Sequence, residues 1–453
     1  MSDWLVIGGG IRGIFAAIYL CKAGYPVTII DAAPHLGGVL YSEHWKGFYV
    51  DKGCHLLDFG NVEVARVYDE ILGDSKHPVN RRYASINRGV KTDGIAVPDL
   101  SMFPAAERMQ AMNEIKQHVF MPARNHGSLS DLLIHRYGPT TSSYVNQAVR
   151  KISTYDASTL APDALFSLPV ERVRLGEDSE MEKLKTILEF DGCLAVSTEK
   201  NPLRFHQDQT EFPHRNYYPS KKGMRGLCEA AEIYLESLGV TVLTGFQVEN
   251  ISIAGQKTIT ENSKTKLVSD RCYWSLPPSF FTKVMKLDNP WGQSAKAVSL
   301  VIYTFVLPRS FIGPYTYIHD YSEDTLSFRV SAPGDYGNQQ DENGNTYISV
   351  EIPVAKESEV WIHPEQFVHK IWNEAISTGI IAEKTSFVDV KVDKMPVAYM
   401  LPGSGWDDAN IRFTKIAEKY SSRIVFANTR TYGKTDLYQS IKSDLGNYIQ
   451  NYE

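Results

Sequence analysis

The chain has 453 residues, of which 43% are hydrophobic and 22% are charged, with a formal net charge of −6 at pH 7. This composition is typical of a globular protein long enough for two domains, and the negative charge argues against a nucleic-acid partner. We find neither the roughly 18 consecutive apolar residues of a transmembrane segment nor a signal peptide, so we expect a cytoplasmic protein.

The five cysteines are scattered, and none of them has the C-x-x-C spacing. They are Cys21, Cys54, Cys193, Cys228 and Cys272. Neither a zinc site nor a disulfide framework is indicated, so we expect reduced thiols and no metal site.

The chain opens with a glycine-rich turn between two apolar runs. Residues 4–7 predict a strand, residues 8–13 read G-G-G-I-R-G, and residues 14–20 predict a helix. The G-x-G-x-x-G pattern between a strand and a helix is typical of a dinucleotide-binding turn.

Each glycine of this turn has a predicted task. Gly8 allows the tight turn, Gly10 lets a pyrophosphate approach the backbone, and Gly13 lets the helix pack on the strand. Ile11 and Arg12 stand at the helix start, where free N–H groups bind phosphates. We therefore predict that residues 8–13 contact the cofactor.

A second apolar run at residues 27–30 ends at Asp31, 23 residues after Gly8, close to the spacing at which a carboxylate binds an adenosine ribose. Ala32 follows it and belongs to the same predicted site.

From about residue 62 to 210 the pattern becomes largely helical, with loops and prolines between the helices. Helices are expected at residues 63–72, 105–119, 128–137 and 143–151.

An α/β pattern returns after residue 217. We expect a helix at residues 223–238, which Gly239 ends, and strands at 240–243 and 267–276. Further strands at 297–307, 327–330 and 346–352 suggest an antiparallel sheet, with a surface loop at 335–346. A buried strand at 423–427 and a helix at about 436–448 close the chain.

The pair Gly37 and Gly38 follows Asp31, and a plain NAD domain does not require it. This pair resembles the double-glycine motif of glutathione-reductase-type flavoproteins, in the branch with amine oxidases, protoporphyrinogen oxidase and phytoene desaturase. The resemblance implies FAD, with Gly37, Gly38 and Val39 beside its pyrophosphate.

Four further segments resemble that family in the same order along the chain. They are residues 47–55, 218–224, 245–248 and 270–277. The resemblance implies that Gly53 and His55 lie by the flavin ring, and that Val248 contacts the adenine.

Near the C-terminus, residues 395–399 (M-P-V-A-Y) resemble the P-x-A-Y segment near the isoalloxazine in protoporphyrinogen-oxidase-like proteins and UDP-galactopyranose mutases. Further on, the resemblance implies flavin contacts from Asn428, Asp436 and Leu437, with Tyr432 in the loop. Backbone N–H groups at a helix start would stabilise negative charge on the reduced flavin.

The chain departs from the family twice in this region. Ala427 and Asn428 stand where the family usually has Gly and Arg, which weakens a charged phosphate contact. Leu437 and Tyr438 stand in place of Met-Asp, which a backbone contact tolerates.

The fold implied is α/β: a glutathione-reductase-type Rossmann FAD domain interleaved with a substrate domain of antiparallel sheet and helices. We assign residues 1–75, 215–290 and 390–453 to the FAD domain, and 76–214 and 291–389 to the substrate domain. Since no cysteine follows Cys272, we expect non-covalent FAD.

Candidate catalytic residues are Tyr317, Arg329 and His55, beside the substrate. Tyr315 and Tyr317 alternate, so we expect both on one face of a strand, with His319 nearby. Arg329 could bind an anionic group of a small-molecule substrate bidentately.

The favoured function is an FAD-dependent oxidoreductase that oxidises a small molecule by hydride transfer to flavin N5. The alternatives are a non-redox flavin-dependent nucleotide-sugar isomerase resembling UDP-galactopyranose mutase, and a flavin-binding protein without turnover. The sequence does not define the substrate, the electron acceptor or the oligomeric state.

Overall fold

The computed structural model describes residues 2–80, 82–122, 125–197, 211–383, 385–427 and 434–452. The chain divides into two compact units, each built from segments separated in sequence. The first unit comprises Met1–Val79, Gln209–Gly292 and Asp407–Glu453, and the second comprises Asn80–Asp208 and Gln293–Trp406.

A five-stranded parallel sheet forms the centre of the first unit, in the order β10-β2-β1-β14-β20. Its strands are β1 (Trp4–Ile7), β2 (Val27–Ile30), β10 (Thr241–Leu243), β14 (Arg271–Trp274) and β20 (Ile424–Phe426). Because the strand order reverses at β1, a ligand is expected at the carboxyl ends of the strands around it.

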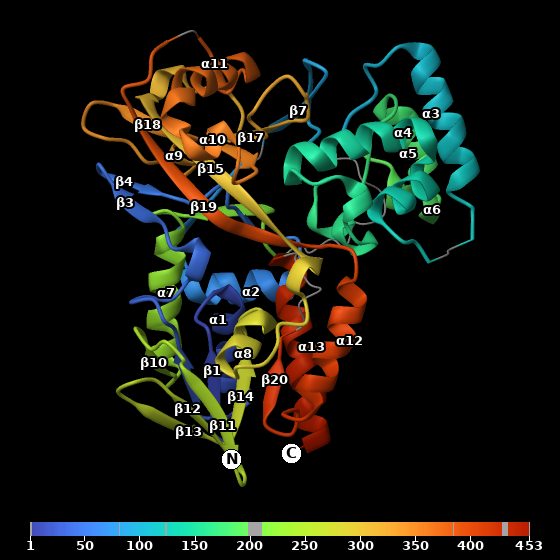
Figure 1. Cartoon of the computed structure of the whole chain (residues 1–453). Helices are drawn as coiled ribbons and strands as arrows, with labels where there is room; N and C mark the ends of the chain where they lie inside the picture. The colour runs from blue at the N-terminus through green and yellow to red at the C-terminus, as the bar shows by residue number, and fades with distance from the viewer. Residues whose placement is uncertain are drawn as a thin grey trace. The chain divides into compact units, whose positions relative to one another are not determined.

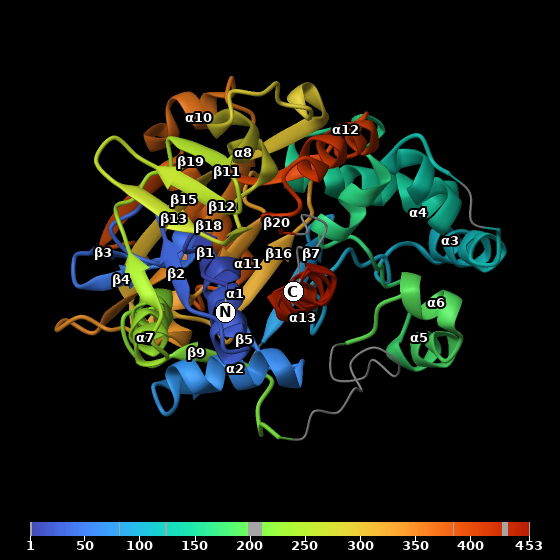
Figure 2. The same ribbon diagram turned by 90° about the horizontal axis from the view of Figure 1, so that it is seen from below.

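Helices lie against one side of this sheet (Figure 2). They are α1 (Ile11–Lys22), α2 (Val62–Leu72), α7 (Met224–Ser237) and α13 (Lys434–Tyr452). The short side chains of Ala16 and Ala17 are fully buried in α1, which lets the helix approach the sheet closely. Phe15 adds an edge-to-face ring contact with Tyr438 of α13 at 5.6 Å.

The other side of the sheet carries an antiparallel sheet of three strands and a short helix. These elements are β11 (Asn250–Ala254), β12 (Lys257–Glu261), β13 (Lys266–Ser269) and α8 (Pro278–Val284). Successive side chains of β14 point to opposite sides of the parallel sheet. Cys272 therefore lies near Thr258 and Thr260 of β12, whereas Tyr273 lies near Arg12 of α1.

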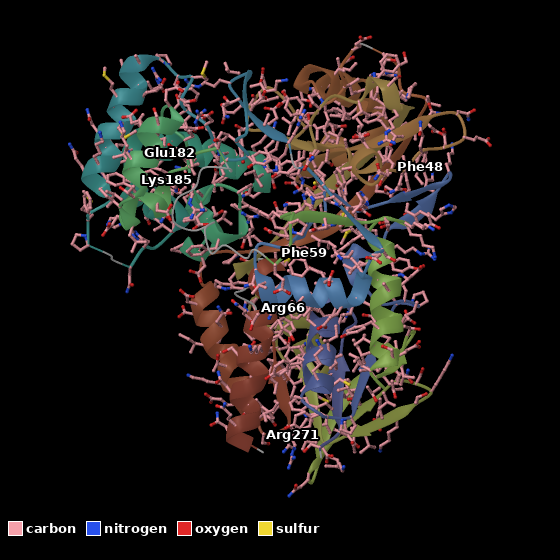
Figure 3. The ribbon with its side chains drawn as sticks, turned by 180° about the vertical axis from the view of Figure 1, so that it is seen from behind. Phe48, Phe59, Arg66, Glu182, Lys185 and Arg271 are labelled. Atoms are coloured by element: carbon pink, nitrogen blue, oxygen red, sulfur yellow. The ribbon has the colours of Figure 1, made fainter. Side chains whose placement is uncertain are left out.

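Smaller elements complete the first unit. They are the hairpin of β3 (Glu43–Trp45) and β4 (Phe48–Val50), the sheet β5-β9-β6 (Leu57–Asp58, Asn216–Pro219 and Lys76–Pro78) and α12 (Trp406–Glu418), whose first residue belongs to the second unit. Phe59, labelled in Figure 3, packs its ring against those of Tyr68, Phe212 and Tyr217.

The second unit contains a seven-stranded sheet in the order β19-β15-β18-β17-β16-β7-β8. Its strands are β7 (Tyr83–Asn87), β8 (Val90–Asp93), β15 (Ala295–Pro308), β16 (Tyr317–Asp320), β17 (Arg329–Ser331), β18 (Asn345–Val354) and β19 (Asp389–Pro402). All neighbouring pairs are antiparallel except β16 with β7.

One face of this sheet is apolar. Ile318, Val330 and Val350 point to it from neighbouring strands and pack in one buried cluster with Trp372. Trp372 belongs to α11 (Val368–Thr378), which lies near α9 (Pro333–Tyr336) and α10 (Glu359–Ile362) in Figure 1.

A helical group forms the rest of the second unit (Figure 1). It contains α3 (Ala105–His118), α4 (Leu129–Ser153), α5 (Asp178–Lys185) and α6 (Leu188–Cys193). Lys185, labelled in Figure 3, is fully buried and places Nζ 2.5 Å from Oδ1 of Asp191. This ion pair links α5 to α6.

Several predicted boundaries differ from the structure. The helices expected at 128–137 and 143–151 are the two arms of α4, which meet at a kink where Gly138 has φ 77° and ψ 169°, so the second helix begins earlier than expected, near Pro139. The strand expected at 267–276 is two strands in different sheets, β13 and β14, separated at Asp270. The stretch from 390 to 402, which we placed in the FAD domain, pairs with β15 in the second unit.

Candidate functional site

The glycine turn connects β1 to α1 in the first unit. Gly8 has φ +98°, and a Cβ on Gly8 would lie 2.6 Å from Ser275 Oγ. A Cβ on Gly13 would lie 1.8 Å from the carbonyl oxygen of Gly8. A Cβ on Gly10 would meet no heavy atom within 4 Å. The fold itself thus requires glycine at positions 8 and 13, whereas at Gly10 the space beside the backbone is open to a ligand.

The N-terminus of α1 faces this space without a cap. The N-cap residue is Gly10, which offers no side-chain acceptor, and the first turn contains no acidic residue. Intrahelical bonds cannot satisfy the first N–H groups of a helix, so those of Ile11, Arg12 and Gly13 form a natural anion-binding end.

The second glycine pair meets the first. The N–H of Gly37 donates to the carbonyl oxygen of Gly9 at 2.7 Å, and Gly10 and Gly37 form an isolated parallel bridge. A Cβ on Gly38 would lie 3.5 Å from Gly10 Cα. Val39, in the 3₁₀ helix Gly38–Leu40, is 61% exposed. Two motifs that are separate in sequence therefore line one cradle.

Asp31 holds the glycine turn in place. Its carboxylate accepts hydrogen bonds from the N–H of Gly9 at 2.6 Å and from that of Ala33 at 2.7 Å. A carboxylate has about four lone-pair sites, so acceptor capacity remains for ribose hydroxyls. The neighbouring Ala32 is exposed.

The segment with Val248 runs beside Asp31. The N–H of Gly245 donates to Ala33 O, and the N–H of Phe246 donates to Asp31 O, each at 2.8 Å. Val248 is half-buried in the loop between β10 and β11. The structure thus brings three sequence-predicted segments together around the carboxyl ends of β1 and β2.

A buried carboxylate that sequence reasoning missed organises the next part of the site. Asp51 follows β4, is 1% exposed, and accepts hydrogen bonds from Ser42 Oγ at 2.5 Å, Tyr218 OH at 2.5 Å and the N–H of Met224 at 3.1 Å. Its only sequence signal was its place inside the 47–55 segment. Asp51 ties β4, β9 and the start of α7 together.

Gly53 and His55 follow Asp51. Gly53 has φ +101°, and its N–H donates to Asp51 O at 3.0 Å. His55 is half-buried in the loop beyond it.

Cys228, which lies against Gly37, and Cys272, which faces β12, are packing residues. A Cβ on Gly37 would lie 2.2 Å from the sulfur of Cys228, and burial raises the pKa of that thiol to about 12. Burial likewise raises the pKa of Cys272 to about 11. Neither thiol forms a reactive thiolate at neutral pH.

Part of the predicted flavin site can be located at α13. Asp436 and Leu437 lie in its first turn, and Leu437 is 6% exposed. Asn428 and Tyr432 lie outside the described residues.

In the second unit, the sheet face opposite the apolar cluster carries polar residues in two adjacent rows, which the strand registers define. We call these residues the polar strip. The first row is Thr304, Ser349, Ser331 and Tyr317, and the second row is Glu351, Arg329 and His319. Candidate residues Tyr317 and Arg329 thus lie on one face of one sheet.

Arg329 is already engaged in an ion pair. Its Nε donates to Glu351 Oε1 and its Nη2 to Glu351 Oε2, each at 2.6 Å. The ion pair thus occupies the guanidinium N–H groups with which Arg329 was expected to bind a substrate anion.

His319 is neutral and buried. Its Nδ1 lies 2.8 Å from Ala96 O, and its ring stacks on that of Phe328 at 4.9 Å. Burial, together with the charge of Arg329, lowers the pKa of His319 to about 3. The ring therefore remains uncharged across the physiological pH range.

Tyr317 and Tyr315 do not share a face, contrary to the expectation. Tyr317 stacks on Tyr83 at 5.5 Å and neighbours His319, whereas Tyr315 packs against the apolar cluster and donates its OH to Asp93. The reason is that β16 begins at Tyr317, so strand alternation does not extend back to Tyr315.

The 395–399 segment forms a bulge on β19. Met395 pairs with Leu300 and Tyr399 pairs with Val298, so residues 396–398 bulge out of the ladder. Tyr399 OH donates to Ile152 O at 3.0 Å, and burial raises the pKa of this phenol. Bulges of this kind are common next to active sites.

The described ranges contain neither a metal-binding cluster nor a membrane-crossing helix. No group of three or more His, Cys, Asp or Glu residues in them has a metal-binding arrangement. Among their helices, none combines the length and apolar character that a bilayer crossing requires.

Comparison with known proteins identifies the fold. Residues 6–71 match the family model of the NAD(P)-binding Rossmann-like domain. The 4,4'-diaponeurosporene oxygenase of Staphylococcus aureus (strain bovine RF122 / ET3-1) is 24% identical over 266 residues, which are 55% of this chain and 50% of that protein. The chain spans about half the length of the curated relatives it matches.

Solved structures are similar over the whole chain. Reduced UDP-galactopyranose mutase superposes with a TM-score of 0.75 at 14% identity, covering 100% of this chain and 94% of its own. Cyclohexylamine oxidase from Brevibacterium oxydans IH-35A superposes with a TM-score of 0.65 at 13% identity, covering 100% of both chains. The chain shares the fold of these solved structures, so the predicted fold class and the predicted resemblance to amine oxidases and UDP-galactopyranose mutase are confirmed.

Proposed function

We propose that the protein is an FAD-dependent oxidoreductase that oxidises a small molecule, with FAD bound non-covalently in the glycine cradle of the first unit. The observation that carries the proposal is the open space at Gly10, bordered by the uncapped start of α1 and by Gly37 and Gly38. Glycines at positions 8 and 13 are explained by packing alone, whereas Gly10 is explained by a ligand.

The residues present fit an adenine dinucleotide. The N–H groups of Ile11, Arg12 and Gly13 would hold the pyrophosphate, Asp31 the ribose, and the Val248 segment the adenine. Gly53, His55, Asn428, Asp436 and Leu437 are the proposed flavin contacts. Bound FAD would supply a hydride acceptor, and the protein supplies binding, orientation and electrostatics.

One feature favours FAD over NAD, and another favours non-covalent over covalent binding. The second glycine pair exceeds what a plain NAD domain needs, and it meets the first pair directly. A C-terminal thioether link is disfavoured because no cysteine follows Cys272, and Cys228 and Cys272 are themselves buried thiols with raised pKa values.

The proposal is tested by absorbance. Purified protein reconstituted with FAD is expected to show a flavin band near 450 nm at one FAD per chain, which acid precipitation releases into solution. Anaerobic addition of an amine or alcohol panel should bleach this band with one member or more. Protein that takes up no FAD contradicts the proposal.

The isomerase remains the second candidate, because the mutase covers the whole chain with a TM-score of 0.75. Turnover of a nucleotide sugar only after reduction by dithionite, with no net redox change, would favour it. Bound FAD with neither activity would favour a flavin-binding protein without turnover.

A further inference from the structure

The second unit contains a cavity of about 340 Å³ between the turn that joins β7 to β8, the helix α4 and the loop after β16. All of its lining residues belong to this unit. Leu100, Phe103 and Tyr144 form an apolar and aromatic wall. The volume lies at the lower end of the range of small-molecule pockets, so the cavity can hold a small ligand or one side chain of a partner.

The aromatic wall already carries one cationic side chain. The guanidinium carbon of Arg88 lies 4.3 Å from the ring centre of Phe103 and 4.3 Å from that of Tyr144. Arg88 occupies the two-residue turn between β7 and β8 with Gly89, and it has φ 51°, where Gly, Asn or Asp is usual. Because a ring face attracts positive charge, these rings suit a cation.

The charge of Arg88 is matched within the unit. Its Nη1 donates to Oε2 of Glu107 at 3.3 Å, and Tyr144 OH donates to the other oxygen of that carboxylate. Arg88 therefore gives the cavity no unmatched positive charge that would attract an anion.

The opposite rim of the cavity is acidic. Glu323 and Asp324 lie at the exposed tip of the loop after β16. Two charged side chains hold the residue before them: Lys151 of α4 donates to Ser322 O at 2.9 Å, and Asp320 accepts from the N–H of Ser322 at 2.8 Å. The loop that presents the two carboxylates is thus fixed from both sides.

The groups around this loop carry an excess of negative charge. Lys151 is close enough to interact electrostatically with Asp320, Asp324 and Glu374, and also with Lys370. With Glu323, four carboxylates therefore accompany two lysines. The excess of two negative charges lies beside a cavity whose wall is aromatic and apolar.

We propose that this cavity binds an organic cation, an ammonium or guanidinium group carried on an apolar stem. The carboxylates of Glu323 and Asp324 bind the charged group, and the stem lies against Leu100, Phe103 and Tyr144. An anion is repelled by the acidic rim, and a neutral molecule gains no ion pair from it. The site lies within the second unit, so it stands whether or not the protein binds FAD.

Three variants separate the effect of charge from the effect of shape. Glu323→Gln combined with Asp324→Asn keeps the size of both side chains and removes both charges. Glu357→Gln combined with Glu359→Gln removes two charges at exposed positions elsewhere in the same unit and is the matched control. Gln147→Trp, on α4, keeps the carboxylates and fills the cavity.

The measurement is calorimetric titration of the full chain, before and after FAD is added. Phenylethylamine and agmatine are the free cations, and the peptide acetyl-Ala-Arg-Ala-amide carries a guanidinium on a polypeptide. Phenylacetate and 2-phenylethanol are the anionic and neutral counterparts of the first probe. We expect a Kd below about 1 mM for at least one cation and no measurable binding of the two counterparts. Binding of the free cations indicates a small-molecule site, and binding of the peptide alone indicates a site for a side chain of a partner.

The variants should change this affinity in different ways. Glu323→Gln/Asp324→Asn should weaken cation binding by about 10-fold or more because the charged acceptors are lost. Gln147→Trp should weaken it by a similar factor, whereas the control should stay within about 2-fold of wild type. Adding about 0.5 M NaCl should also weaken binding to wild type, because salt screens the exposed carboxylates.

The outcomes separate this proposal from the proposed function. Equal binding of 2-phenylethanol, tighter binding of phenylacetate, wild-type affinity in Glu323→Gln/Asp324→Asn, or no cation binding at about 5 mM would each overturn the cation site. Should Gln147→Trp fail to fold by circular dichroism, the charge variant at the exposed loop still decides. A chain that binds cations but no FAD contradicts only the proposed function.

Discussion

Single residues in the cradle show why a motif needs its structure. The three glycines of the G-x-G-x-x-G motif look equivalent in the sequence, but their surroundings differ. Protein atoms crowd Gly8 and Gly13, whereas none lies within 4 Å of a Cβ placed on Gly10. The crowding at Gly8 and Gly13 was predictable because the motif is local, and the task assigned to Gly10 stays a prediction. The surroundings of His319 were not predictable, since they depend on a contact with Ala96, far away in the chain.

Gly10→Val is expected to abolish FAD binding without unfolding the protein. The backbone at Gly10 has φ −66°, which any residue adopts, and the added side chain meets no protein atom at Cβ. It would occupy the space proposed for the pyrophosphate. Equilibrium dialysis with FAD and circular dichroism measure the two effects.

Gly13→Ala is the matched control. Its Cβ would lie 1.8 Å from a backbone oxygen, so we expect lost stability rather than selective loss of FAD. Stoichiometric FAD in Gly10→Val would refute the assignment of the open space.

His319 should also produce a pH effect on stability. Burial and the charge of Arg329 lower the pKa of His319 from 6.5 to about 3, so between these pH values the unfolded chain binds a proton that the native ring does not. Stability then falls as pH decreases from 6.5 towards 3, by about 1.4 kcal/mol per pH unit. Urea unfolding of wild type and His319→Phe at pH 7, 6 and 5 tests this. Parallel pH dependences would contradict it.

At the scale of elements, local patterns predicted several of the long helices and strands but not their partners. The apolar runs at 297–307 and 346–352 correspond to β15 and β18. The prediction of one strand at 267–276 was wrong, because a continuous apolar run does not reveal that the chain passes from one sheet to another. The polar strip depends on registers between strands such as β7 and β16, which are distant in sequence and carry no local signal.

Asp51 connects elements, and its removal should affect all of them. Asp51→Ala leaves Ser42, Tyr218 and the start of α7 without a shared acceptor. We expect the free energy of unfolding to fall by about 3 kcal/mol and FAD affinity to fall with it. Chemical denaturation and FAD titration measure these changes.

Asp69→Ala is the control for Asp51→Ala. Asp69 pairs with Lys76 while its side chain is 45% exposed, and exposed ion pairs contribute at most about 1 kcal/mol. Equal losses in the two variants would contradict the role assigned to Asp51.

At the scale of the whole molecule, each compact unit is assembled from interleaved segments. The sequence indicated this interleaving because nucleotide-binding patterns recur in three places. The cofactor and substrate contacts assigned to these segments stay a prediction. The sequence did not reveal that the second unit extends to Trp406. The reason is that β19 resembles any amphipathic strand until its partner, β15, is known.

FAD should stabilise the protein in a concentration-dependent way. A ligand that binds only the native state at 100 times its Kd adds about 2.7 kcal/mol, here to the first unit. Differential scanning calorimetry with FAD is expected to raise the transition of that unit, and NAD at the same concentration to leave it in place. An equal shift with NAD would argue for a plain nicotinamide site.

The bulge at residues 396–398 has a consequence for association between molecules. It interrupts β19, an outermost strand of the seven-stranded sheet, and it contains Pro396, which has no N–H to offer a neighbour. The opposite border, β8, carries Lys91, a charge that discourages strand addition. Both borders of the sheet therefore resist templating by a foreign strand, which protects the long apolar β15 and β18 between them from amyloid-like growth.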